Sequence, residues 1–147
     1  MGYASTRDPI SAHSQAFREW VENLPGNPRI SVVAHSLGNI VLRHAIARWQ
    51  QEGDPKDVLG RLHRVVMLGP PNQGSAFAAR LSKMGLFEMV TGSTGQHLGP
   101  NWSGLSGDLA IPSCPFAIAV GDVSDAPIGN PFLQGPNDGV VTLEEAT

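Results

Sequence analysis

The chain has 147 residues, of which 41% are hydrophobic and 16% are charged, and its formal net charge is −3. This composition predicts one globular domain over residues 1–147, and its acidic balance, without a Lys/Arg cluster, argues against a nucleic-acid partner. The single cysteine, Cys114, excludes an internal disulfide, and no stretch approaches the roughly 20 apolar residues of a transmembrane segment.

The first half of the chain alternates between helical and extended patterns. Asp8-Pro9 is typical of a helix start, and apolar residues at helical spacing predict a helix that runs to Leu24. A β-branched run predicts a buried strand over 29–34, and an apolar stripe predicts a helix over 37–51. We therefore expect a strand, a tight turn and a helix in direct succession.

The second half repeats the alternation with a long interruption. We expect a buried strand over 64–68, a helix over 75–84 and a third buried strand over 116–120. Residues 84–113, rich in Gly, Ser and Pro towards their end, predict an irregular excursion typical of a lid. Residues 140–143 fit either a short fourth strand or the run into a helix. The order predicts an α/β fold with a mostly parallel sheet and helices on both faces.

The junction at Ser36 carries the clearest chemical signal. Ala34-His35-Ser36-Leu37-Gly38 matches the small-x-Ser-x-small pattern of a nucleophile elbow, a strand-to-helix turn so sharp that the serine backbone is strained. We expect the small residues Ala34 and Gly38 to be required because a bulky side chain would collide as strand and helix close together. The hydroxyl would then stand clear of the sheet, at the carboxyl end of a parallel strand.

A helix that starts directly after Ser36 adds an electrostatic argument. Its free N–H groups and its dipole favour the negative charge that develops during acyl transfer, and Leu37 would supply one N–H of an oxyanion hole. The alternative is that Ser36 is an ordinary N-cap serine, which is common where a helix follows a strand.

A family resemblance is carried by four stretches: Tyr3-Ala4-Ser5-Thr6, VVAHSLGNIVLRHAI, VVMLGPPNQGSAFA and NPFLQGPNDGVVTLEEA. They resemble bacterial α/β-hydrolases of the lipase and esterase type, including relatives of the triacylglycerol lipase and GPI inositol-deacylase groups. The resemblance implies a partial α/β-hydrolase fold and identifies Asp138 as the triad acid that would hold the catalytic histidine. Asp122 and Asp125 are rival acids, and Asp138 before Gly139 also fits simple turn chemistry.

The same resemblance exposes missing parts. Hydrolases of this fold carry the triad in the order Ser, acid, His, yet no histidine follows Asp138. His35 is expected to be a packed neighbour of Ser36, and His97, on the presumed lid, is the least implausible substitute base. A second oxyanion N–H is also unaccounted for. We therefore expect an internal piece of a longer hydrolase, truncated at both ends, inactive by itself, with its histidine beyond Thr147. The other histidines are His13, His44 and His63.

The sequence thus predicts a serine ester hydrolase that forms an acyl-enzyme on Ser36 and acts on a small-molecule ester or lipid. Met84, Phe87 and Leu98 are candidate acyl-binding residues, although an amphipathic helix packed on the core would explain them equally well. The alternatives are a non-catalytic fragment that binds a hydrophobic ligand or partner, and an acyltransferase on the same scaffold. No cofactor is expected, and no residue cluster has metal-ligand spacing. Oligomeric state and localisation stay open, with the cytoplasm expected if the chain start is native and no signal peptide was lost.

Overall fold

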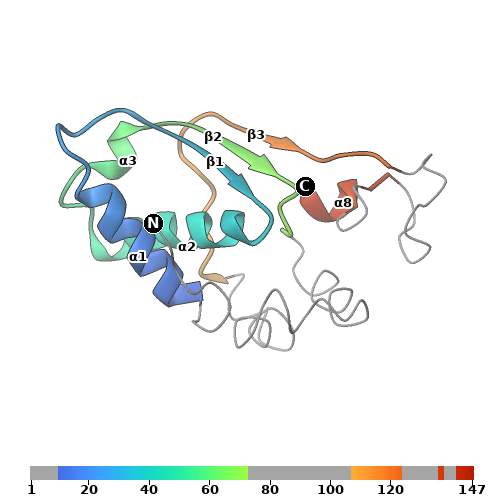
Figure 1. Ribbon diagram of the computed structural model, residues 1–147. Coiled ribbons are helices and arrows are strands. Elements are labelled where there is room, and N and C mark those ends of the chain that lie inside the picture. Colours follow the sequence, from blue (N-terminus) through green and yellow to red (C-terminus); the bar gives the residue numbers. More distant parts are fainter. Residues whose placement is uncertain (1–9, 73–106, 124–135, 138–141) are drawn as a thin grey trace.

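The computed structural model describes residues 10–72, 107–123, 136–137 and 142–147, and Figure 1 gives their arrangement. The predicted helices and strands in these ranges are present to within about two residues, and residues 143–146 form a short helix. In chain order the elements are α1 (Ile10–Glu22), β1 (Ile30–His35), α2 (Leu37–Glu52), α3 (Val58–Arg61), β2 (Leu62–Leu68), β3 (Phe116–Ala119) and α8 (Leu143–Ala146).

The three strands form one parallel sheet in the order β1-β2-β3. Ala34 of β1 pairs with Met67 of β2, which pairs with Ile118 of β3. Parallel neighbours need a crossover connection, and α2 supplies the one between β1 and β2. The prediction of a partial α/β fold with a parallel sheet is confirmed.

The hydrophobic core lies between the sheet and α2, with α1 packed beside α2 on the same side of the sheet (Figure 1). Ile46 of α2 and Val65 of β2 are at most 1% exposed, and Val21 brings α1 into the same cluster. Trp49 of α2 is 2% exposed, and its indole N–H donates to Glu22 Oε1 at 2.7 Å. Apolar residues at helical spacing thus bury one stripe of each helix.

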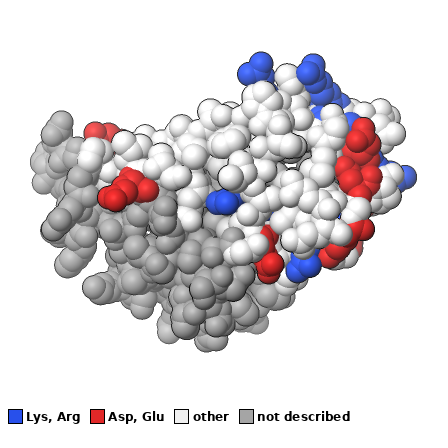
Figure 2. All heavy atoms as spheres, turned by 180° about the vertical axis from the view of Figure 1, so that it is seen from behind, with Lys and Arg blue, Asp and Glu red and all other residues white. Residues whose placement is uncertain are grey.

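The opposite face of the sheet, which the sequence predicts to be covered as well, carries Val33 with 69% of its surface exposed. Val33 pairs with Val66, and the burial pattern of β1 alternates accordingly. Figure 2 shows a face of the molecule on which side chains of both charge signs gather towards one end, while its middle is largely uncharged.

The sequence did not predict α3, which lies between α2 and β2. The Asp54 carboxylate accepts the backbone N–H groups of Val58 at 2.8 Å and Leu59 at 2.7 Å. One side chain therefore satisfies two first-turn donors and stabilises a single helical turn that has no periodicity of its own.

Candidate active site

Ser36 forms the sharp turn between β1 and α2 that the sequence predicts. Its backbone has φ 50° and ψ −126°, a conformation that a residue with a Cβ rarely adopts. The residue is half-buried, and its side chain makes no capping hydrogen bond to α2. An ordinary N-cap serine has an extended or similar negative-φ backbone and bonds the first turn of its helix, so the observed turn differs from that alternative.

Hydrogen bonds to neighbouring groups stabilise the strained backbone of Ser36. The Ser36 N–H donates to Leu68 O, at the end of β2, at 2.9 Å, and Asn39 N donates to Ser36 O at 3.0 Å. The Asn39 side chain, 0% exposed, donates to the same two carbonyl oxygens. Sequence reasoning missed Asn39, for which the available signal was a polar residue at the third helical position beside the apolar stripe of α2.

Leu37 begins α2, and the N–H groups of a first helical turn have no acceptor within their own helix. Its side chain packs against a buried cluster formed by Ile10, Ile40 and Ala146. The Leu37 backbone is therefore anchored from α1, α2 and α8, while its N–H remains at the positive end of the helix dipole, where a developing oxyanion is favoured.

The two small residues of the pattern differ in their surroundings. Ala34 is 8% exposed and belongs to the core cluster, as expected of a position with no room for a larger side chain. Gly38 is exposed, and a Cβ built on it would meet no atom of the described residues within 4 Å. The expectation that a side chain at Gly38 collides with the neighbouring chain is wrong, because this position faces outwards from the first turn of α2.

Asn137, the residue before the predicted acid, contacts the segment that follows β3. Val123 N, shortly after β3, donates to Asn137 O at 2.7 Å, and Asn137 forms an antiparallel bridge with Thr142. Asp138 itself lies outside the described residues, as does Asp125. The rival Asp122 is exposed and directly precedes Val123.

A polar network joins α2 to the loop after β2 and to α8. Arg43 donates through Nη1 to Asn72 Oδ1 at 2.7 Å and through Nε to Ala110 O at 3.0 Å. Asn72 Nδ2 in turn donates to Ala146 O at 2.6 Å. Burial lowers the pKa of the Arg43 guanidinium, whose partners here are all neutral acceptors. The network fixes the elements that surround the start of α2.

The described histidines are spread over different parts of the fold. His35 is exposed at the end of β1, so the expectation of a packed neighbour is wrong: its side chain follows the strand alternation onto the outer face. His44 is 4% exposed, two helical turns beyond Ser36, and His63 lies near the start of β2, at the opposite edge of the sheet. His13 lies on α1, and His97 is outside the described residues.

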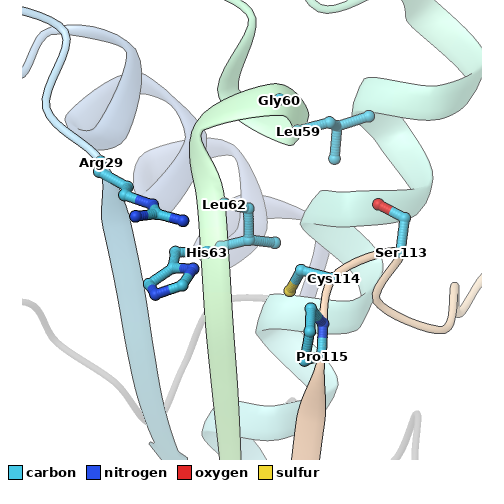
Figure 3. A pocket seen from close by; sticks show the side chains of 8 residues that line it. All are labelled: Arg29, Leu59, Gly60, Leu62, His63, Ser113, Cys114 and Pro115. Atoms are coloured by element: carbon cyan, nitrogen blue, oxygen red, sulfur yellow. The ribbon is translucent and has the colours of Figure 1, made fainter.

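The predicted acyl-binding residues Met84, Phe87 and Leu98 are outside the described residues as well. A hollow of about 280 Å³ opens at the amino ends of the strands, opposite to Ser36, and Figure 3 shows the side chains around it. Burial, reinforced by the charges of Arg29 and Arg64, lowers the pKa of His63 in this hollow. The lining residues are Arg29, Leu59, Gly60, Leu62, His63, Ser113, Cys114 and Pro115.

Within the described ranges, no group of three or more His, Cys, Asp or Glu residues could hold a metal ion. Across the same ranges, every helix is too short or too polar to cross a membrane. These two observations concern only the described part of the chain.

Comparison with known proteins identifies one family. The family model described as "Putative serine esterase (DUF676)" matches residues 13–101, more than half of the chain. The match includes β1, Ser36, α2 and β2, and it ends before Asp138. No curated protein and no solved structure matches the chain. The strained serine at a strand-to-helix junction is therefore found inside a recognised family domain, and the chain belongs to this serine esterase family.

Proposed function

We propose that this chain supplies the nucleophile of a serine hydrolase that cleaves carboxylic esters, and that Ser36 is this nucleophile. The backbone of Ser36, at φ 50° and ψ −126° between a parallel strand and a helix, carries the proposal. Strained conformations of this kind cost free energy and cluster at functional sites. The family match, which includes this turn, supports the same activity class.

In the proposed reaction, Ser36 Oγ loses its proton to a histidine base and forms a bond to the acyl carbonyl carbon of the ester. The Leu37 N–H donates to the oxyanion of the tetrahedral intermediate. The ester C–O bond then breaks, the alcohol leaves with the proton from the histidine, and water releases the acid from the acyl-enzyme. Asp138 would orient the histidine and stabilise its protonated form.

The proposed substrate class rests on the side chains that we assign to binding of the acyl group. Met84, Phe87 and Leu98 are apolar and adaptable, which suits the chain of a small-molecule ester or a lipid. We propose them as acyl-binding residues, with no cofactor in the reaction.

A fluorophosphonate probe tests the nucleophile, because it forms a stable bond with an activated serine. The protein as its gene encodes it should label at Ser36, located by peptide mass spectrometry, and Ser36→Ala should abolish labelling. Ser31→Ala is the matched control, since Ser31 is an exposed serine on β1, the strand that leads into Ser36. Labelling that survives in Ser36→Ala refutes the proposal.

Absence of labelling in a folded parent protein would favour the non-catalytic alternative. If unlabelled protein, in a preparation whose Ser36 reacts with the probe, transfers acyl groups faster to added alcohols than to water, the acyltransferase alternative is correct.

The acid is tested with two isosteric variants. Asp138→Asn removes the charge that supports the histidine and should slow ester turnover by about 10²–10⁴-fold. Asp122 directly precedes Val123, whose N–H donates to Asn137 O, and Asp122→Asn should change turnover by less than about tenfold. A larger loss in Asp122→Asn would reverse the assignment of the acid without affecting that of Ser36.

A further inference from the structure

The Asn39 side chain lies at the centre of the hydrogen bonds around Ser36. It is 0% exposed, and its Nδ2 donates to Ser36 O at 2.9 Å and to Leu68 O at 3.2 Å. Both neighbours are carbonyl oxygens, which only accept hydrogen bonds, so the amide nitrogen must face them. Its Oδ1 is buried and has no donor among the described residues.

These bonds connect the turn to the neighbouring strand. Leu68 O accepts the Ser36 N–H at 2.9 Å and also the Asn39 amide, while Ser36 O accepts both the backbone N–H and the side chain of Asn39. One buried amide therefore bridges the carbonyl of the strained residue and the carbonyl that receives its N–H. A strained backbone persists only where its surroundings over-determine it, and this bridge provides that constraint.

We propose that Asn39 is a positioning residue: it clamps the Ser36 turn to the end of β2 and so fixes the direction of the Ser36 hydroxyl and of the Leu37 N–H. Its catalytic consequence rests on the proposed function, whereas the clamp itself does not. A residue that merely fills the core would lower stability when replaced, but it would not change the reactivity of the folded protein or depend on the strain at Ser36.

The reactivity test measures phosphonylation of Ser36 over a range of fluorophosphonate concentrations, in the protein as its gene encodes it. Asn39→Ala should lower the maximal rate by about ten- to a hundredfold, because small misplacements of reacting groups cost factors of this size, with little change in half-saturation. Ile46→Val is the matched control: Ile46 is also 0% exposed, lies about two helical turns further along α2, and belongs to the core cluster between the helices and the sheet. An unchanged maximal rate in folded Asn39→Ala refutes the positioning role.

A double-mutant cycle in urea tests the clamp without any chemistry. Glycine adopts positive φ without strain, so Ser36→Gly removes the strain that Asn39 is proposed to hold. In the parent, loss of Asn39 lets the turn relax and recover strain energy; in the Ser36→Gly background there is none to recover. Asn39→Ala should therefore lower the folded-to-unfolded ratio more in the Ser36→Gly background than in the parent. The two factors should differ by about fivefold or more. Equal factors in both backgrounds refute the clamp.

Asn39→Asp gives a second measurement of the clamp, and it takes the place of Asn39→Ala if that variant does not fold. The carboxylate has nearly the same shape but no donor, and it would face two carbonyl oxygens, which raises its pKa above the unfolded value. The free energy of unfolding of the Asn39→Asp variant should therefore be lowest near neutral pH. It should recover as the pH falls, because the protonated acid donates one hydrogen bond. A pH-independent loss equal to that of Asn39→Ala contradicts the clamp. Coupling in the cycle without any labelling at Ser36 would instead refute the proposed function and leave the clamp intact.

Discussion

Replacing Ser36 with glycine should stabilise the protein. The positive φ of 50° places the Ser36 Cβ in an unfavourable position, and strain of this kind costs about 1–3 kcal/mol. Glycine removes that cost, but the more flexible unfolded chain takes back about 0.4–1 kcal/mol. At the middle of both ranges, the expected net gain in the free energy of unfolding is about 1.3 kcal/mol.

Ser36→Ala separates strain from the loss of the hydroxyl. Alanine retains the Cβ and hence the strain, and the Ser36 hydroxyl makes no capping bond to lose, so its stability should stay within about 0.5 kcal/mol of the parent. Asn27→Gly is a second control: φ is 46° there, but asparagine tolerates the left-handed region, so the gain should be smaller than at Ser36.

Urea midpoints at constant slope and thermal midpoints measure the difference, and one kcal/mol corresponds to about 2–4 °C for a domain near this size. Ser36→Gly should unfold at the highest urea concentration of the set and should not label with a fluorophosphonate. If Ser36→Gly is no more stable than Ser36→Ala, the turn stores no strain, and the argument that links its geometry to function fails.

Three further changes follow from the described contacts. Gly38→Ala should stabilise the protein by about 0.5–1 kcal/mol in urea, because Gly38 meets no described neighbour and alanine is the better helix former. Arg43→Met should cost about 1.5–3 kcal/mol in the same assay, since it breaks charge-assisted bonds to Asn72 and Ala110, and retention of the parent midpoint would contradict the network. Burial, followed by the Arg48 charge, lowers the pKa of His44 below its ordinary 6.5, so the unfolded chain takes up the proton first as the pH falls. Stability should therefore decrease below about pH 6.5, and His44→Leu should flatten that decrease in urea midpoints.

Local patterns were enough to predict β1, α2, β2 and β3, because each has an apolar period or run long enough to be read by itself. The turn at Ser36 was also predictable, since its pentapeptide falls at the junction of two such patterns. Single-turn α3 was not, because the Asp54 carboxylate from outside the helix stabilises it.

Contacts between distant residues were beyond the sequence patterns. Arg43 and Asn72 are 29 positions apart, and Asn72 is 74 positions from Ala146, yet they form one network. The exposure of Gly38 was likewise unpredictable, because the small-x-Ser-x-small pattern is satisfied whether or not its second small residue is packed. Asn39 looked like an ordinary first-turn residue until its amide was placed against Leu68 O, an acceptor on another strand.

The choice between Asp138 and Asp122 illustrates why order along the chain does not decide a site. The Val123 N–H to Asn137 O bond joins the residue after Asp122 to the residue before Asp138. A single backbone contact thus brings the two segments that carry the rival acids to one edge of the sheet, the edge where β1 ends and Ser36 turns into α2. Both aspartates also follow Ser36 in the chain, so the proposed order Ser, acid, His fits either of them. The two acids differ in whether loss of the negative charge slows the reaction. Asp138→Asn and Asp122→Asn measure this directly, because each removes the charge of one carboxylate and keeps its shape.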